Sequence, residues 1–317
     1  MKIVFLGTPE FAVPSLESII AAGYGLRLVV TQPDRPKGRE GTPQPPPVKL
    51  VAQAHAIPVY QPESVNSEES VSRLAAEQPD VLAVAAFGQI LRKRVIELPR
   101  TACINVHASL LPKYRGAAPV PAAIANGERV TGVTIQKVVR KLDAGDIIRQ
   151  GPIPIGDDET AGDLAERLAR LGGTLLIEAL RDLEHGTAQF VPQDDSQATS
   201  APMLSKEDGL IRWLQSAEQI ARHVRAMTPW PGAFAFLARG GQPLRITIKR
   251  AHAESGGTEQ PGEPGEIVSV GRERFAVKAG CGALAIVELQ PAGKRQMSAA
   301  EFIRGYRITT GDRFAEG

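Results

Sequence analysis

The sequence predicts an α/β domain built on a mostly parallel sheet, followed by a smaller antiparallel β-barrel. Apolar runs of strand length alternate with helix-length stretches over residues 1–189, a pattern typical of βαβ units and a parallel sheet. After residue 232 the chain consists of short strand-like runs separated by Gly- and Pro-rich turns. A chain of 317 residues is long enough for two domains that each bury a core.

The first βαβ unit lies at the N-terminus. Lys2–Leu6 and Leu26–Thr31 are apolar, β-branched runs that predict parallel strands, and the stretch between them has apolar residues at helical spacing up to Gly23. The turn after the first run contains no Gly-x-Gly-x-x-Gly fingerprint. A dinucleotide site is therefore not indicated, which argues against an NAD-dependent oxidoreductase.

A long loop interrupts the alternation between Asp34 and Lys49. This segment, DRPKGREGTPQPPPVK, is rich in proline, glycine and charge, and loops of this length are usually functional or disordered. Its basic side chains are Arg35, Lys37, Arg39 and Lys49. They fit a flexible finger for phosphate or nucleic acid, and they fit a plain surface insertion equally well.

The α/β alternation resumes after this loop. A helix that runs from Leu164 to near Gly186 is predicted by its apolar face, and we interpret it as packing. The other expected helices are at 48–56, 68–77 and 119–126, and the expected strands are at 58–60, 81–87 and 132–139.

Polar side chains follow the apolar run Ala102–Ile104, where its strand should end. Asn105 and His107 are two residues apart, so on a strand both point to the same side. Ligands of open parallel sheets bind beyond the carboxyl ends of the strands, where Phe87–Leu91 would form a neighbouring wall. An amide donor and an imidazole there fit acyl transfer, whereas ordinary structural hydrogen bonding is the alternative.

Asp143 is a candidate partner for His107. It lies in the turn-rich segment 141–148, just past the strand expected at 132–139. A carboxylate beside an imidazole orients the ring and favours its charged form. Asp146 is a second candidate, and turn capping would explain either aspartate.

A polar, aperiodic segment at 190–205 is interpreted as a linker between domains at 1–189 and 206–317. The second domain carries a net charge of +4, which fits a polyanionic partner or ordinary surface variation. It begins with a helix at Ser216–Met227, and five strand-like runs then fit a small Greek-key barrel such as an OB-fold. These runs are Gly232–Leu237, Leu244–His252, Gly265–Val270, Arg274–Ala279 and Ala283–Leu289.

The chain has two cysteines, Cys103 and Cys281, at a spacing that matches no zinc motif, so no metal is expected. Two distant cysteines do not suggest a disulfide framework, which fits a reducing compartment. No signal peptide and no apolar run of membrane-spanning length is recognisable. We therefore expect a cytoplasmic protein that does not contact a membrane.

Several segments carry a resemblance to a known family. They are MKIVFLGTPEFA, TQPDRPKGR, INVHASLLPKYRGAAP, GVTI followed by LDAGDI, LSKEDGLIRW, TPWPGA and LQPAGKRQMSAAEF. With them the chain resembles the methionyl-tRNA formyltransferase family over nearly its full length. The N-terminal segments are common to enzymes that use 10-formyltetrahydrofolate, whereas the basic loop, TPWPGA and LQPAGKRQMS narrow the resemblance to the tRNA enzymes.

The resemblance implies a Rossmann-like formyl-transfer domain and an OB-like C-terminal domain that helps to hold tRNA. The reaction would move a formyl group from 10-formyltetrahydrofolate, a co-substrate, to the α-amine of initiator methionyl-tRNA. No metal would be needed, and we expect a monomer. Two segments depart from the family pattern, GREGTPQPPPVK in the basic loop and QKVVRK at 136–141.

The resemblance also implies site residues. The family's catalytic positions fall on Asn105, His107 and Asp143. The expected folate-contacting residues are Ser109, Leu110, Leu111 and Pro112, with Phe87, Gly88, Gln89, Ile90 and Leu91 as a neighbouring wall. The expected tRNA-contacting residues are Arg35, Lys37, Arg39, Lys49 and Lys206.

Two other functions remain alternatives to tRNA formylation. A 10-formyltetrahydrofolate enzyme that acts on an amino sugar nucleotide or a purine precursor would share the catalytic residues, but the C-terminal barrel and the basic loop favour tRNA. An RNA-binding protein without catalysis is disfavoured because Asn105, His107 and Asp143 are all present.

Overall fold

The computed structural model divides the chain into two compact units, which we call the N-terminal and C-terminal units. The C-terminal unit includes two short segments that precede residue 165, so the units are not two uninterrupted stretches. The division into 1–189, 190–205 and 206–317 stays a prediction. The described residues are 1–36, 41–238, 242–254 and 261–315. The N-terminal unit comprises Met1–Pro119, Val130–Pro154 and Ala165–Pro202, and the C-terminal unit comprises Val120–Arg129, Ile155–Leu164 and Met203–Gly317.

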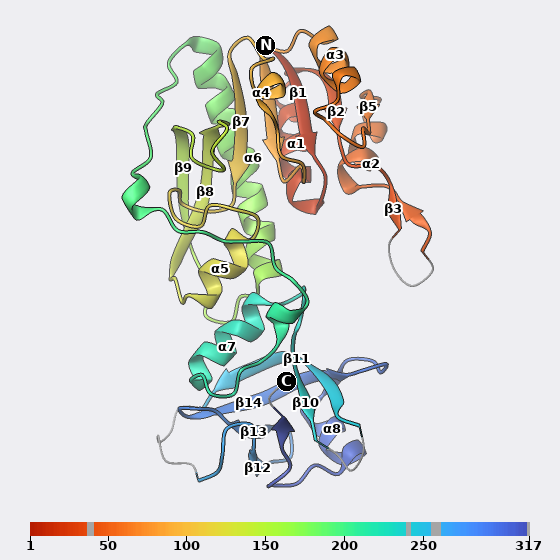
Figure 1. Cartoon of the computed structure of the whole chain (residues 1–317), viewed down its shortest axis with the longest axis vertical. Coiled ribbons are helices and arrows are strands. Elements are labelled where there is room, and N and C mark those ends of the chain that lie inside the picture. Colours follow the sequence, from red (N-terminus) through yellow and green to blue (C-terminus); the bar gives the residue numbers. More distant parts are fainter. Residues whose placement is uncertain (37–40, 239–241, 255–260, 316–317) are drawn as a thin grey trace. The chain divides into compact units, whose positions relative to one another are not determined.

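The N-terminal unit is organised around a sheet that contains seven strands in the described residues, in the order β5-β2-β1-β6-β7-β8-β9. The strands from β5 to β7 are parallel, and β8 and β9 are added antiparallel at one edge (Figure 1). The predicted parallel-rich α/β class is therefore confirmed. The strands are β1 Lys2–Gly7, β2 Gly25–Val30, β5 Val59–Tyr60, β6 Val81–Ala85, β7 Ala102–His107, β8 Val130–Lys137 and β9 Ile147–Pro154.

Strand β9 was not predicted from the sequence. Its run IIRQGPIP contains Gly151 and two prolines, which weaken a strand signal but are tolerated at a sheet edge. A Cβ added at Gly132 of β8 would lie 2.2 Å from the Gly151 carbonyl oxygen. Glycine at position 132 therefore permits the close approach of β8 and β9, and this contact depends on pairing that the local sequence does not show.

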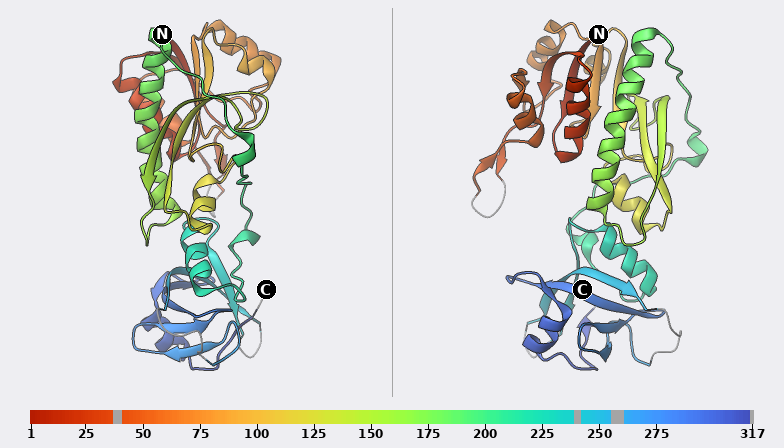
Figure 2. Two further views of the ribbon diagram at one scale, coloured as in Figure 1. Left: turned by 90° about the vertical axis from the view of Figure 1, so that its left-hand side faces the viewer. Right: turned by 180° about the vertical axis from the view of Figure 1, so that it is seen from behind.

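Helices cover both faces of this sheet. The helices α1 and α6 lie on one face (Figure 2, right) and approach each other at Gly173 of α6, where a Cβ would be 2.8 Å from the Pro14 carbonyl oxygen. On the other face, Leu74 of α3 and Val95 of α4 pack into a buried apolar cluster with strand residues such as Leu82. The helices in the first 189 residues are α1 Val13–Ala21, α2 Pro47–Ala54, α3 Glu68–Ala76, α4 Lys93–Ile96, α5 Pro119–Ala125 and α6 Ala161–His185, with a 3-10 turn at Glu10–Ala12. Of these, α5 lies in the C-terminal unit from Val120 onward.

The central strands are apolar because they are covered on both faces. All five residues of β6, VLAVA, are buried, as expected for a parallel strand between two helix layers. Burial of one such valine or leucine side chain contributes about 1.5–3 kcal/mol. Cys103 of β7 belongs to the same cluster, and burial raises the pKa of its thiol to about 12.

The C-terminal unit contains a separate antiparallel sheet in the order β12-β13-β14-β11-β10-β16, with β15 paired to β14. The helix α7, Ala217–Ala226, lies within the span predicted for it, Ser216–Met227. It begins with a capping box between Ser216 and Gln219. The strands are β10 Ala233–Leu237, β11 Leu244–Ala253, β12 Ile267–Val270, β13 Phe275–Lys278, β14 Ala283–Pro291, β15 Met297–Ser298 and β16 Phe314–Ala315, and a 3-10 turn lies at Glu207–Gly209. A further 3-10 turn, Asp195–Gln197, belongs to the N-terminal unit.

The expectation that only strands follow residue 232 is wrong at α8, which spans Ala299–Tyr306. Its capping box was visible in the sequence as Ser-x-x-Glu: the Ser298 hydroxyl accepts the Glu301 backbone N–H, and the Glu301 carboxylate accepts that of Ser298. The helix buries Phe302 completely. Among the described helices, none combines the length and the apolarity that a bilayer crossing needs.

The capping box of α8 gives the C-terminal unit a pH-dependent contribution to stability. Hydrogen bonds from the Ser298 backbone and from Arg295 lower the pKa of Glu301 to about 2, from its ordinary value of 4.5. Because the folded-state pKa is depressed, this contribution is complete above the unfolded-state pKa and is lost as the pH falls from about 4.5 toward 2.

We therefore expect Glu301→Gln to lower the free energy of unfolding near neutral pH, and the difference from wild type to shrink as the solution is acidified toward pH 3. Urea unfolding followed by circular dichroism measures both differences. Glu273→Gln is the matched control, because Glu273 is exposed and has no ion pair within the described residues. A deficit of the Glu301 variant that stays constant with pH would contradict this account.

Candidate active site

The candidate site begins at the carboxyl end of β7. Asn105 and His107 point to one side of the sheet, and Val106 points to the other, where it meets α6 at Gly172. Asn105 lies beside Gln136 of the antiparallel neighbour β8. The alternation of a β-strand thus places the amide and the imidazole together and turns the valine into the core.

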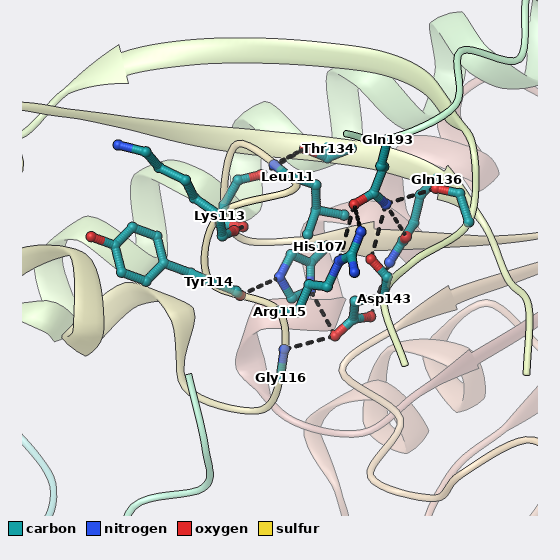
Figure 3. Close-up of polar contacts among 12 residues, drawn as sticks. His107, Leu111, Lys113, Tyr114, Arg115, Gly116, Thr134, Gln136, Asp143 and Gln193 are labelled. Atoms are coloured by element: carbon teal, nitrogen blue, oxygen red, sulfur yellow. Dashed lines mark hydrogen bonds and ion pairs between the residues drawn. The ribbon is translucent and has the colours of Figure 1, made fainter. Parts of the chain in front are cut away.

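The His107 ring is 5% exposed and lies between two oxygen atoms. Its Nε2 is 2.9 Å from the carbonyl oxygen of Tyr114, and its Nδ1 is 3.7 Å from Oδ2 of Asp143 (Figure 3). A carbonyl oxygen can only accept, so Nε2 must carry a hydrogen. Nδ1 faces the carboxylate, so the ring lies between a hydrogen-bond acceptor and a negatively charged group.

Tyr114 presents its carbonyl oxygen from an unusual backbone conformation. Its φ is 61°, in the left-handed region that bulky residues rarely adopt. The Tyr114 backbone N–H donates to the Thr199 hydroxyl at 2.8 Å, and the Arg115 backbone N–H donates to the Thr199 carbonyl oxygen at 2.8 Å. Contacts with residues far along the chain therefore hold the turn that binds His107.

The Asp143 carboxylate is held by two donors. The Gly116 backbone N–H donates to Oδ2 at 2.9 Å, and Nε2 of Gln136 donates to Oδ1 at 2.9 Å. Of the two aspartates weighed from the sequence, Asp143 faces His107, whereas the backbone carbonyl of Asp146 pairs with β8. The carboxylate is thus aimed at the imidazole by its own hydrogen bonds.

Two glutamines complete this network, and sequence analysis did not single them out. Gln136 is buried on β8, in a segment noted only as a departure from the family pattern. Gln193 lies in the segment interpreted as a linker, which pairs with the N-terminal unit through Val191 and Ser200. A glutamine in an aperiodic polar segment has no pattern that distinguishes it, so no sequence signal could have found Gln193.

Asn105 is half-buried, and its side-chain amide has no hydrogen bond within the described part of the chain. Because it stands two residues before His107 at the strand end, this amide is available to a ligand oxygen. The amide, the imidazole and the carboxylate together form a set that can stabilise negative charge on a reacting carbonyl oxygen.

The four residues predicted to contact folate after β7 form a tight turn. The Ser109 hydroxyl donates to the Lys113 carbonyl oxygen at 2.6 Å, so it is already engaged. Thr134 of β8 donates to the Ser109 carbonyl oxygen at 2.7 Å and accepts the Leu111 N–H at 3.1 Å. Ser109 and Leu111 are buried, whereas Leu110 and Pro112 are half-buried.

The predicted wall Phe87–Leu91 follows β6, the parallel neighbour of β7, so both segments leave the sheet at the same edge. The Phe87 side chain is buried, and Gly88 has a φ of 88°. The Gln89 side chain accepts the Val65 backbone N–H at 2.7 Å. Ile90 is 79% exposed and offers an apolar surface there, beside the half-buried Leu91.

The base of the predicted basic loop is fastened by ion pairs. Lys49 lies in α2 and donates to both carboxylate oxygens of Asp34, at 2.8 and 2.9 Å. Gln61 donates to the same carboxylate, and the hydrogen bonds from Gln61 and Lys49 hold the pKa of Asp34 below its ordinary value. Arg35 pairs with Glu63 at 2.9 Å. Both basic residues are therefore already engaged by carboxylates.

Three predicted tRNA contacts remain. Two of them, Lys37 and Arg39, lie outside the described residues. Lys206 is exposed at the start of the 3-10 turn Glu207–Gly209. Throughout the described ranges, no group of three His, Cys, Asp or Glu side chains lies together as a metal site would require.

Comparison with known proteins gives two family models that match different parts of the chain. The family model described as formyl transferase matches residues 1–180, and that described as formyl transferase, C-terminal domain, matches residues 203–307. The chain is 47% identical over 311 residues to the methionyl-tRNA formyltransferase of Citrifermentans bemidjiense, covering 98% of this chain and 95% of that one. It is 46% identical over 316 residues to that of Geobacter sulfurreducens, covering 100% and 97%.

A solved structure shares the fold at low sequence identity. The N-formyltransferase from Helicobacter canadensis, in complex with folinic acid and dTDP-3-aminofucose, matches with a TM-score of 0.65. The match covers 94% of this chain and all of that one, at 19% identity.

The path of the loop that carries Asp143 depends on Gly145. A Cβ at this position would lie 1.7 Å from the Lys137 carbonyl oxygen. We expect Gly145→Ala to push the loop away from β8 and to lower the free energy of unfolding by about 1–3 kcal/mol, as overpacking typically does.

Urea unfolding measures this loss. Gly305→Ala in α8 is the control, because nothing lies within 4 Å of its added Cβ and alanine favours a helix by up to about 1 kcal/mol. Equal stability of Gly145→Ala and wild type would show that the loop tolerates the displacement.

Proposed function

The chain belongs to the methionyl-tRNA formyltransferase family, and from this premise we propose how its residues perform the reaction. The enzyme transfers a formyl group from 10-formyltetrahydrofolate to the α-amino group of initiator methionyl-tRNA. The near-complete overlap with curated relatives at 46–47% identity supports this activity. The observation that carries the proposed site is the unpaired Asn105 amide beside the His107–Asp143 pair at the end of β7.

The neutral amine of the methionyl group attacks the formyl carbon, and the carbonyl oxygen becomes negatively charged. Asn105 donates a hydrogen bond to this oxyanion, which is typically worth roughly 3–4 kcal/mol of transition-state stabilisation. The bond from the formyl carbon to N10 of the folate then breaks. The amine loses one proton and N10 gains one, so the step needs no metal and no covalent enzyme intermediate.

His107 supplies positive charge beside the reacting carbonyl, and Asp143 orients the ring. In the structure both ring nitrogens face protein oxygens, at 2.9 Å from Tyr114 and 3.7 Å from Asp143. Direct donation to the oxyanion would require a substrate oxygen to replace the Tyr114 carbonyl. Asp143 keeps the charged ring in place and assists the relay of the proton that the amine loses.

We place the folate against the two segments that follow β6 and β7, Phe87–Leu91 and Ser109–Pro112. The complex of the Helicobacter canadensis relative with folinic acid supports a folate co-substrate for this chain. Since the Ser109 hydroxyl is engaged by Lys113, we assign the folate contacts here to backbone groups and to exposed apolar atoms such as those of Ile90.

The tRNA would be held by the basic loop and the C-terminal unit. We propose that the antiparallel sheet of this unit is an OB-like barrel, because strands β10 to β14 form one continuous antiparallel sheet. Residues 206–317 carry a net charge of +4, which suits a polyanion. We propose that the enzyme works as a cytoplasmic monomer.

A small amine is the second candidate acceptor, since the Helicobacter canadensis relative of the same fold is in complex with dTDP-3-aminofucose. One assay decides between the acceptors. 10-Formyltetrahydrofolate is offered with initiator methionyl-tRNA, uncharged tRNA or an amino sugar nucleotide in parallel. Formylation of methionyl-tRNA alone supports the proposal, whereas transfer to the sugar amine with methionyl-tRNA ignored overturns it.

We expect Asn105→Ala to lower kcat by about 10²–10³-fold, as loss of one oxyanion donor does. We expect His107→Ala to lower kcat as well, because it removes the ring that Asp143 orients beside the reacting carbonyl. Binding of tRNA should be unchanged, because neither residue is assigned to it. Steady-state formylation and a filter-binding assay measure the two effects. His55→Ala, at an exposed position at the end of α2, is the control. A matching loss of tRNA binding would show that the residues act structurally.

For the basic loop, we expect Arg39→Ala to raise the KM for tRNA and to spare the KM for the folate donor. If Arg39 contacts a phosphate, the slope of log affinity against log salt concentration falls by roughly one. Arg27→Ala is the control, since Arg27 is exposed on β2, toward its amino end and away from the carboxyl edge of the sheet. A higher KM for the donor would contradict the assignment of the loop to RNA.

A further inference from the structure

Gln193 connects two loops that surround the proposed catalytic pair. Its Nε2 is 2.9 Å from the Asp143 carbonyl oxygen and 2.7 Å from that of Gly145 (Figure 3). Its Oε1 accepts from Nε and Nη2 of Arg115, at 3.1 and 2.7 Å. Because carbonyls only accept and a guanidinium only donates, this orientation of the amide is the one that satisfies all four contacts.

Gln136 extends the connection to the carboxylate itself. Its Oε1 lies 3.3 Å from Nε2 of Gln193, and its Nε2 donates to Oδ1 of Asp143 at 2.9 Å. Donors and acceptors therefore follow one direction from Arg115 through Gln193 and Gln136 to Asp143. Gln136 is 2% exposed, and hydrogen bonds of a buried network reinforce one another.

Arg115 belongs to the turn that touches both catalytic groups. Tyr114 before it presents the carbonyl oxygen to His107, and Gly116 after it donates its N–H to Asp143. The Arg115 side chain is largely buried and is neutralised by Asp195 at 2.8 Å. Hydrogen bonds from Lys141 and from Arg115 hold the pKa of Asp195 below its ordinary value. The guanidinium that Gln193 binds is thus fixed on both sides.

We propose that Gln193 is a positioning residue for formyl transfer. It fastens the turn Tyr114–Gly116, which holds His107, to the loop 143–145, which carries Asp143, and so maintains the approach of the carboxylate to the imidazole. The inference rests on the proposed function of that pair, and Gln193 acts through Asp143. A displacement of about 1 Å at a catalytic group is sufficient to cost on the order of a hundredfold in rate.

The test begins with Gln193→Met, which preserves the length of the side chain and removes all its hydrogen bonds. We expect kcat for methionyl-tRNA to fall about ten- to a hundredfold while both KM values stay within about twofold. Gln197→Met is the matched control, because Gln197 lies in the same segment, is exposed and bonds to Asp194 within that segment. A Gln193 variant as fast as wild type would overturn the inference.

A double-mutant cycle with Asp143→Asn separates positioning from general support of the fold. If Gln193 acts through Asp143, Gln193→Met loses most of its effect on kcat once Asp143 is replaced. An equal fold-change in both backgrounds would show a merely structural role and overturn the inference. If Gln193→Met does not fold, Gln136→Met enters the same cycle, since it breaks the link to Oδ1 of Asp143.

The wild-type assay distinguishes failure of the inference from failure of the proposed function. Wild-type activity on methionyl-tRNA with no loss in Gln193→Met overturns the role of Gln193 and leaves the function intact. Activity on an amino sugar nucleotide alone overturns the proposal that methionyl-tRNA is the acceptor. The double-mutant cycle is then measured with the amino sugar nucleotide as acceptor, and its result decides the role of Gln193. No formyl transfer by the wild-type enzyme overturns both.

Discussion

The buried imidazole of His107 faces a carbonyl oxygen on one side and a carboxylate on the other, and the rest of the site depends on this constraint. Neither neighbour can donate a hydrogen, so Nε2 donates to the carbonyl oxygen and Nδ1 faces the carboxylate. A buried polar ring requires partners held in fixed positions. The left-handed turn at Tyr114 and the two hydrogen bonds to the Asp143 carboxylate provide these positions.

The N-terminal sheet explains why the site lies where it does. Parallel strands β6 and β7 end at the same edge, so the segments after them must leave the sheet together. The antiparallel strand β8 then brings Gln136 beside Asn105 and Thr134 beside His107. Gly132 of β8 allows β9 to approach β8 closely, and Gly145 of the Asp143 loop allows that loop to approach the end of β8. The mixed sheet thus joins a strand-end crevice to a loop that supplies the carboxylate.

Much of this fold could be predicted from apolar periodicity, including the parallel strands, the amphipathic α6 and the separate C-terminal strands. The failures have particular causes. Strand β9 contains glycine and two prolines that an edge position tolerates. The helix α8 is short, and its capping box was overlooked among strands. Lys49 was counted both in the loop Asp34–Lys49 and in the helix expected at 48–56. It lies in α2, which begins at a proline, and it pairs with Asp34.

The sequence by itself determined the α/β class, the alternation that puts Asn105 and His107 on one side of a strand, and two candidates for the carboxylate. Tertiary structure decided which aspartate faces the imidazole, because that choice depends on the Gly116 N–H and on Gln136. It also brought Gln193 to the site from 50 residues beyond Asp143. A hydrogen bond between such distant residues leaves no local period or propensity, so its partners become recognisable when the chain is folded.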